Sequence, residues 1–157
     1  MRTALLLFCL LLVTVGALAQ TATRPKATGN GTIDTYVTNS FDLHDKVEAQ
    51  KSAFYNVEKL IQDGRAASGG KLTDAQVQEI LPKLEEISNN VTDLQGDVQE
   101  LASGFAGMQA EAKKLPPTKV PAALKAVDAA NDINKKSAAD LTTLATGVAD
   151  QIKALKG

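Results

Sequence analysis

The chain has 157 residues, of which 17 are Lys or Arg and 18 are Asp or Glu, so its formal net charge is −1 at pH 7. A charge this balanced does not indicate a nucleic acid or an anionic membrane as partner. The sequence contains one cysteine, one histidine and no tryptophan, which leaves few residues for thiol chemistry or for a zinc site.

Residues 1–19 are typical of a secretory signal peptide. Arg2 gives a positive start, residues 4–15 form a nearly continuous apolar run, and residues 17–19 read Ala-Leu-Ala, a small-residue cleavage site. The apolar run is too short for a membrane span. We therefore expect a secreted, extracellular protein without a transmembrane segment, and the cell wall is one such location. Cys9 is lost with the signal, so the mature chain is expected to have no disulfide.

Residues 20–31 are rich in Thr, Ala, Gly and Lys and contain almost nothing to bury. This composition predicts a disordered tail. Asn30 and Asn90 each begin an Asn-x-Thr sequon, so in a secreted protein both are candidates for N-glycosylation.

Residues 32–157 predict a single helical-bundle domain. A short separate N-terminal helix can form first, and the first long helix is expected after Asn39 or Ser40, either of which can cap it. This helix ends before the glycines at 69 and 70. Its apolar face has the spacing of an amphipathic helix and consists of Leu43, Val47, Phe54, Val57 and Ile61.

The second helix carries the strongest pattern in the chain. Thr73 and Gln76 have the spacing of a capping box at its start, and the prolines at 116 and 117 stop it. Between these limits apolar residues recur at alternating spacings of three and four, which is a sustained heptad repeat. We call this set the apolar seam and expect it to form core or ligand contacts: Val77, Ile80, Leu84, Ile87, Val91, Leu94, Val98, Leu101, Phe105, Met108 and Leu115.

The last helix is expected to begin at Thr118 or Lys119, with Pro121 in its first turn. Three helices joined by short turns predict an all-α, elongated, antiparallel up-down-up bundle. A straight second helix would be roughly 63 Å long, which exceeds the diameter of a compact domain of this size. Either the bundle is elongated or the second helix bends, and we favour a bend at Pro82 or at residues 104–107. The apolar face of the last helix is formed by Val120, Leu124, Val127, Ile133, Leu141, Leu144, Val148, Ile152 and Leu155.

No group of residues in the sequence predicts a reaction. His44 lies beside Asp42 and Asp45 and is expected to be a solvated or capping side chain. No serine lies in the glycine motif of a nucleophile elbow, and no cluster of His, Cys or carboxylate residues has the spacing of metal ligands. We therefore expect a protein that is not an enzyme and that uses no cofactor or metal.

Five short segments carry a resemblance to a known family, and they read in order Leu43-His44, Lys71-Leu72-Thr73-Asp74-Ala75, Ile80-Leu81, Lys113-Lys114-Leu115-Pro116 and Asp140-Leu141-Thr142-Thr143-Leu144. Over residues 43–150 this order resembles the fungal hydrophobic surface-binding protein A family, which includes secreted and cell-wall mannoproteins. The resemblance implies a non-enzymatic helical protein that adsorbs to hydrophobic surfaces or binds fatty acids.

Two functional interpretations follow. In the first, a secreted helical protein binds a fatty acid, another apolar ligand or a hydrophobic surface through its apolar helix faces. In the second, the apolar seam pairs with another chain, which makes the protein a structural or self-associating coiled-coil module of the extracellular matrix or cell wall. The residues beside the seam are mostly small or neutral, which favours an intramolecular bundle over a dimeric zipper.

Overall fold

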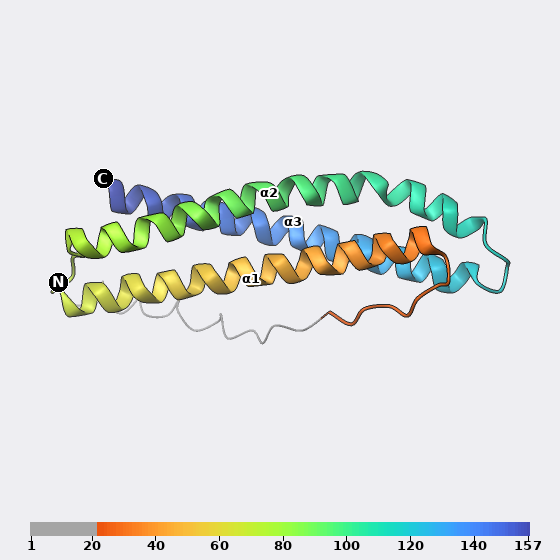
Figure 1. Cartoon of the computed structure of the whole chain (residues 1–157), viewed down its shortest axis with the longest axis horizontal. Coiled ribbons are helices and arrows are strands. Elements are labelled where there is room, and N and C mark those ends of the chain that lie inside the picture. Colours follow the sequence, from red (N-terminus) through yellow and green to blue (C-terminus); the bar gives the residue numbers. More distant parts are fainter. Residues whose placement is uncertain (1–21) are drawn as a thin grey trace, which may run out of the picture.

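The computed structural model describes residues 22–157, and the predicted signal peptide lies outside these described residues. The described chain forms three helices, α1 (Gly31–Ala67), α2 (Asp74–Lys113) and α3 (Val120–Lys156), and contains no strand. Figure 1 shows the three helices side by side, running up, down and up, as an elongated bundle. The all-α three-helix bundle predicted from the sequence is confirmed.

α1 begins at Gly31, nine or ten residues earlier than the sequence analysis expected. Asn30 is its N-cap, and the Asn30 side-chain oxygen accepts a hydrogen bond from the backbone N–H of Ile33 at 3.1 Å. The separate N-terminal helix and the cap at Asn39 or Ser40 were wrong predictions, because the helix runs through both residues. Ser40 is fully buried, and its hydroxyl donates to the backbone carbonyl of Tyr36 at 2.9 Å. A serine that can bond back to its own helix does not need to end it.

The turn between α1 and α2 depends on glycine at three positions. Gly69 and Gly70 have φ values of +70° and +105°, a region that side chains with a Cβ rarely adopt. Gly64 lies against the returning chain, since a Cβ placed there would be 2.6 Å from Cδ2 of Leu72. These glycines let the chain reverse tightly enough for α2 to pack against α1.

α2 starts with the predicted capping box and continues without interruption to Lys113. The Thr73 backbone N–H donates to Oε1 of Gln76 at 2.9 Å, and the Gln76 N–H donates to Oγ1 of Thr73 at 3.3 Å. The helix passes through Pro82 and residues 104–107 without a break. Figure 1 shows a gradual curve along α2, and not the local bend that we expected at one of these places. Pro82 is exposed, so water can satisfy the carbonyl group that it leaves without a partner.

The core consists of two hydrophobic clusters that follow each other along the bundle. The cluster near the α1–α2 turn contains Leu43, Val47, Val57, Ile61, Ile80, Leu84, Ile87, Val91, Leu94, Val98, Leu141, Leu144 and Val148. The cluster near the α2–α3 turn contains Ile33, Tyr36, Val37, Phe41, Ala112, Ala123, Ala126, Val127, Ala130 and Ile133. Four of the ten residues in the second cluster are alanines, whereas the first cluster contains none, so the second fills less apolar volume for each residue.

Residues 22–30 form no helix or strand, and Figure 1 shows them turning back beside α1. Arg24 pairs with Asp42 at 2.7 Å and with Asp45 at 2.6 Å, and Ala22 packs against the cluster near the α2–α3 turn. These ion pairs are exposed and therefore contribute little to stability. The disorder expected for residues 20–31 stays a prediction.

Candidate functional site

The apolar seam lies inside the bundle, where α1 and α3 of the same chain cover it. Six of its eleven residues are buried, and these are Ile80, Leu84, Ile87, Val91, Leu94 and Val98. The other five are half-buried, and these are Val77, Leu101, Phe105, Met108 and Leu115. Leu101 packs against both clusters, whereas Phe105, Met108 and Leu115 pack against the cluster near the α2–α3 turn.

A layer of buried polar residues lies where the two apolar clusters meet. We call it the polar layer, and it consists of Tyr36, Ser40 and His44 from α1 with Asn134 and Ser137 from α3. All five side chains are buried. Polar groups removed from water are costly unless they are paired, so the contacts within this layer decide how well α1 and α3 hold together.

One half of the polar layer is built around the Asn134 amide. Nδ2 of Asn134 donates to Oγ of Ser40 at 3.0 Å and to the phenol oxygen of Tyr36 at 3.5 Å. Oδ1 of Asn134 has no hydrogen-bond partner, although the residue is only 1% exposed. Burial raises the pKa of Tyr36, and the hydrogen bonds with Asn134 and Ser40 act against this rise. This half of the layer is therefore incompletely satisfied.

The other half is built around His44, which is 2% exposed. Nδ1 of His44 lies 3.2 Å from Oγ of Ser137, and Nε2 lies 3.9 Å from Oε1 of Glu48. The sequence-based interpretation of His44 as a solvated or capping residue was wrong. It failed because α1 was started too late, which placed His44 in the first turn of a helix instead of on its buried stripe.

The sequence does contain a signal for the polar layer. Counting back from Val47 in steps of three and four reaches His44, Ser40, Val37 and Ile33. The same steps on α3 connect Val127, Ala130, Asn134, Ser137 and Leu141. Such a layer is predicted when two helices each carry polar residues within an otherwise apolar stripe, and these residues lie at the same level along the bundle.

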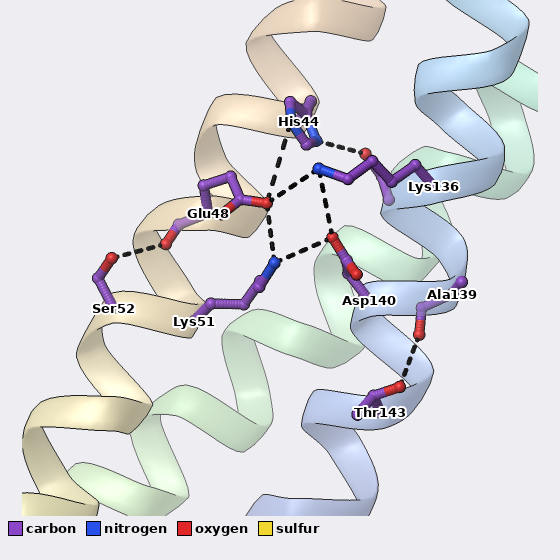
Figure 2. Close-up of polar contacts among 9 residues, drawn as sticks. His44, Glu48, Lys51, Ser52, Lys136, Ala139, Asp140 and Thr143 are labelled. Carbon is purple, nitrogen blue, oxygen red and sulfur yellow. Dashed lines mark hydrogen bonds and ion pairs between the residues drawn. The ribbon is translucent and has the colours of Figure 1, made fainter. Parts of the chain in front are cut away.

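Four charged residues border the polar layer at the α1–α3 boundary, and we call them the charge cluster. They are Glu48 and Lys51 from α1 with Lys136 and Asp140 from α3, and Figure 2 shows them directly below His44. Lys51 Nζ lies 2.9 Å from Glu48 and 3.1 Å from Asp140. Lys136 Nζ lies 3.5 Å from Glu48 and 4.0 Å from Asp140. Two carboxylates and two ammonium groups thus balance one another across the helix boundary.

The pKa values follow from burial and from this arrangement. Burial lowers the pKa of His44, the charge of Lys136 lowers it further, and the nearby carboxylates of Glu48, Asp45 and Asp140 raise it by less. For Glu48 burial acts to raise the pKa, but the hydrogen bond and charge of Lys51 and the charge of Lys136 outweigh it, so the pKa is lowered. The layer is therefore built around a neutral imidazole beside an ionised carboxylate.

Ser137, His44 and Glu48 lie in a row that has the residue types of an acyl-transfer triad. In such a triad the serine oxygen must reach a substrate carbonyl. Ser137 is 0% exposed, so its oxygen faces the packed interior of the bundle and not a binding site. No three His, Cys, Asp or Glu side chains within residues 22–157 are placed to hold a metal ion. These three side chains can hold α1 and α3 in register, and the His44 imidazole can take up a proton.

The two glycosylation candidates lie in different surroundings. Asn30 is the N-cap of α1, and this role uses its Oδ1. Asn90 is half-buried in the middle of α2, and its Nδ2 lies 3.4 Å from Oε1 of Gln50 on α1. A glycan on Asn90 would replace this contact. Use of either sequon stays a prediction.

The outer surface offers little apolar area. Among the large hydrophobic side chains of the described chain, Tyr55 and Leu60 are the exposed ones. Two open grooves lie between α1 and α2, with volumes of about 320 Å³ and 360 Å³. The first is lined mainly by charged and polar residues such as Asp97 and Glu100. No helix in the described part is long and apolar enough to cross a membrane.

Comparison of the chain with protein-family models, with curated proteins and with solved structures found no match. The similarity to the hydrophobic surface-binding family therefore stays a prediction that depends on the five quoted segments.

Proposed function

We propose that this protein is a secreted, non-enzymatic binding protein that separates its helices and lays their apolar faces on a lipid or another hydrophobic surface. The observation that carries this proposal is the distribution of apolar surface. Three amphipathic helices of 37 to 40 residues hold nearly all their large apolar side chains inside. A fatty acid is a small ligand that the same apolar helix faces could bind.

The closed bundle is poorly suited to such a partner. Its exposed large hydrophobic residues are Tyr55 and Leu60, and the grooves between α1 and α2 mix polar and apolar lining residues. Binding to an apolar surface therefore requires that the core becomes accessible. Each large aliphatic side chain gains roughly 1.5–3 kcal/mol from burial, and an external apolar surface can supply much of that gain in place of the neighbouring helices.

The boundary between α1 and α3 is the place where we expect the bundle to open. The polar layer interrupts the apolar core there, and Asn134 Oδ1 lacks a partner. The charge cluster loses little when it separates, because water can solvate partly exposed ions. The glycines at 69 and 70 in the α1–α2 turn give α1 a joint at which it can rotate away from α2 and α3.

A cross-link between α1 and α3 tests this proposal. In the double variant Lys51→Cys, Asp140→Cys, a short reducible bifunctional thiol reagent joins the two helices at a position where the native side chains are 3.1 Å apart. We expect the linked protein to lose adsorption to phosphatidylcholine vesicles and to hydrophobic beads, and to regain it when the linker is reduced. Cys9 is the only native cysteine, and it lies in the predicted signal peptide.

A second linked variant serves as the control. Glu85→Cys, Lys156→Cys joins α2 to α3, whose native side chains lie 2.9 Å apart, and leaves α1 free. This variant should still adsorb. If the α1–α3 link leaves adsorption intact, the bundle binds without opening at this boundary. If the unmodified protein adsorbs to neither vesicles nor beads, the proposed function is wrong.

The alternative function, self-association through the apolar seam, needs the same opening, since α1 and α3 cover the seam in the closed chain. Light scattering separates the two interpretations. A monomer at high concentration that adsorbs to vesicles supports surface binding, whereas a concentration-dependent oligomer that the α1–α3 link abolishes supports the structural module.

A further inference from the structure

We propose that His44 is an acid-sensitive latch, so that protonation of its imidazole releases α1 from α3 and exposes the apolar faces of the helices. The consequence for surface binding rests on the function proposed above, whereas the release itself does not. The inference begins from the position of His44 in the polar layer at the α1–α3 boundary.

The geometry around the imidazole favours its neutral form. With the proton on Nε2, the N–H points toward the Glu48 carboxylate, and Nδ1 is free to accept from the hydroxyl of Ser137 at 3.2 Å. A proton added to Nδ1 turns this acceptor into a donor. Ser137 must then accept, and its own hydroxyl proton has no second acceptor among the described hydrogen bonds. Protonation thus leaves a buried donor unpaired, which is unfavourable.

The charges around His44 act in both directions, since Lys136 disfavours the imidazolium whereas Glu48, Asp45 and Asp140 favour it. The charged groups that act on the imidazole are Asp45 and Glu48 from α1 with Lys136 and Asp140 from α3, and none of them belongs to α2. Glu48 is the nearest carboxylate to the imidazole, and it already faces the Lys136 ammonium at 3.5 Å.

Lys51 completes this balance, since it pairs with both carboxylates of the charge cluster. Two lysines and two carboxylates of the charge cluster sum to zero charge, and Asp45, the other carboxylate that acts on the imidazole, is paired with Arg24 at 2.6 Å. An imidazolium therefore adds one positive charge for which no unpaired carboxylate is at hand. Figure 2 shows that the lysine ammonium groups and the imidazole converge on the same Glu48 oxygen. The imidazolium would be a third positive charge beside this oxygen. It is therefore more stable when the helices separate and water solvates it than in the closed bundle.

The sign of the pH dependence follows from proton linkage. Burial and Lys136 hold the pKa of His44 below its ordinary value in the closed bundle, and separation of the helices restores that ordinary value of about 6.5. The open state therefore binds more protons on acidification, and the closed state becomes progressively less stable relative to it as the pH falls below about 6.5. The opening equilibrium constant should rise by up to about tenfold for one pH unit below that value, and should be constant above it.

His44 is the only histidine in the chain, so its titration can be measured without ambiguity. The NMR resonances of the imidazole give its pKa in the folded protein, and urea denaturation at pH 7.5, 6.5 and 5.5 gives the unfolding constant. In His44→Gln the amide can still contact Ser137 but cannot titrate, and this variant should show no change between pH 6.5 and 5.5. Flotation with phosphatidylcholine vesicles at pH 7.5 and 5.5 measures binding, which should increase on acidification in the wild type only.

The outcomes distinguish the latch from the proposed function. An imidazole pKa at or above the ordinary value, or an equal pH response in His44→Gln, would overturn the latch. Vesicle binding that is equal at both pH values, together with an unfolding constant that does not change with pH, retains the function and removes the latch. A pH-dependent unfolding constant with no vesicle binding at either pH retains the latch and removes the function. The NMR titration uses the wild type, so the inference stays testable if His44→Gln fails to fold.

Discussion

Replacement of Asn134 by leucine should stabilise the bundle, although it removes two hydrogen bonds. Asn134 is 1% exposed, donates to Ser40 and Tyr36, and has an Oδ1 atom with no partner. Leucine has nearly the same shape and carries no polar atom. The Ser40 hydroxyl keeps its own bond to the Tyr36 backbone carbonyl, so the substitution does not isolate that donor.

The magnitude follows from the groups that are gained and lost. The two hydrogen bonds contribute about 1 kcal/mol each, and the contact with Tyr36 is long at 3.5 Å. Removal of the unpaired buried oxygen relieves about 1–3 kcal/mol, and burial of a leucine side chain adds roughly 1.5–3 kcal/mol. Imperfect packing of the new side chain costs up to about 1.5 kcal/mol. We expect Asn134→Leu to raise the free energy of unfolding by about 1–2 kcal/mol.

Urea denaturation at pH 7.5 measures this change, and the midpoint of thermal unfolding should rise by roughly 3–5 °C for each kcal/mol. Asn131→Leu, one turn earlier on α3 at a half-buried site, is the matched control and should change the free energy of unfolding by less than about 0.5 kcal/mol. A destabilisation of more than about 1 kcal/mol in Asn134→Leu would refute the reasoning. It would mean that the polar layer contributes net stability and that the orphan oxygen is satisfied by a bound water molecule.

Four alanine variants test three further local features of the fold by urea denaturation. Gly96→Ala, where the Cβ meets nothing within 4 Å, should gain about 0.5–1 kcal/mol. Gly64→Ala should lose that gain or destabilise by up to about 1 kcal/mol, because the new Cβ would meet the terminal Cδ2 methyl of Leu72 at 2.6 Å and this side chain must shift. Equal effects at the two sites would contradict the close approach at Gly64. Thr73→Ala should cost about 1 kcal/mol because α2 loses its capping box, and an unchanged stability would mean that water caps α2 equally well. Leu84→Ala at a fully buried position should cost about 2–5 kcal/mol, and a loss below 1 kcal/mol would show that the seam is loosely packed there.

The ends of the helices could be predicted where the signal is local. The Thr73–Gln76 capping box, the turn glycines at 69 and 70, and Pro121 in the first turn of α3 are all where the sequence placed them. Each depends on bonds or torsions within a few residues of the chain, so no distant contact is needed to specify it. The start of α1 was missed because Asn30 and Ser40 are both acceptable caps by composition.

The polar layer shows where such local reasoning fails. His44, Ser40, Asn134 and Ser137 are ordinary surface residues by type, and only their periodic positions connect them to the apolar stripes. Their pairing joins residues more than ninety positions apart, and no local preference encodes which buried donor meets which acceptor.

The sequence by itself determined that this chain forms three long helices with a sustained apolar seam, because heptad periodicity and end signals are properties of each helix alone. Only the tertiary structure decided that α1 runs unbroken from Gly31, that the seam is covered within the same chain, and that His44 is buried beside Ser137. The reason is that the burial of a side chain depends on which side chains of the neighbouring helix lie at the same level along the bundle. An apolar stripe on one helix shows only that this face must be covered. The packing of α1 against α3 decides which polar side chains are buried together with the stripe.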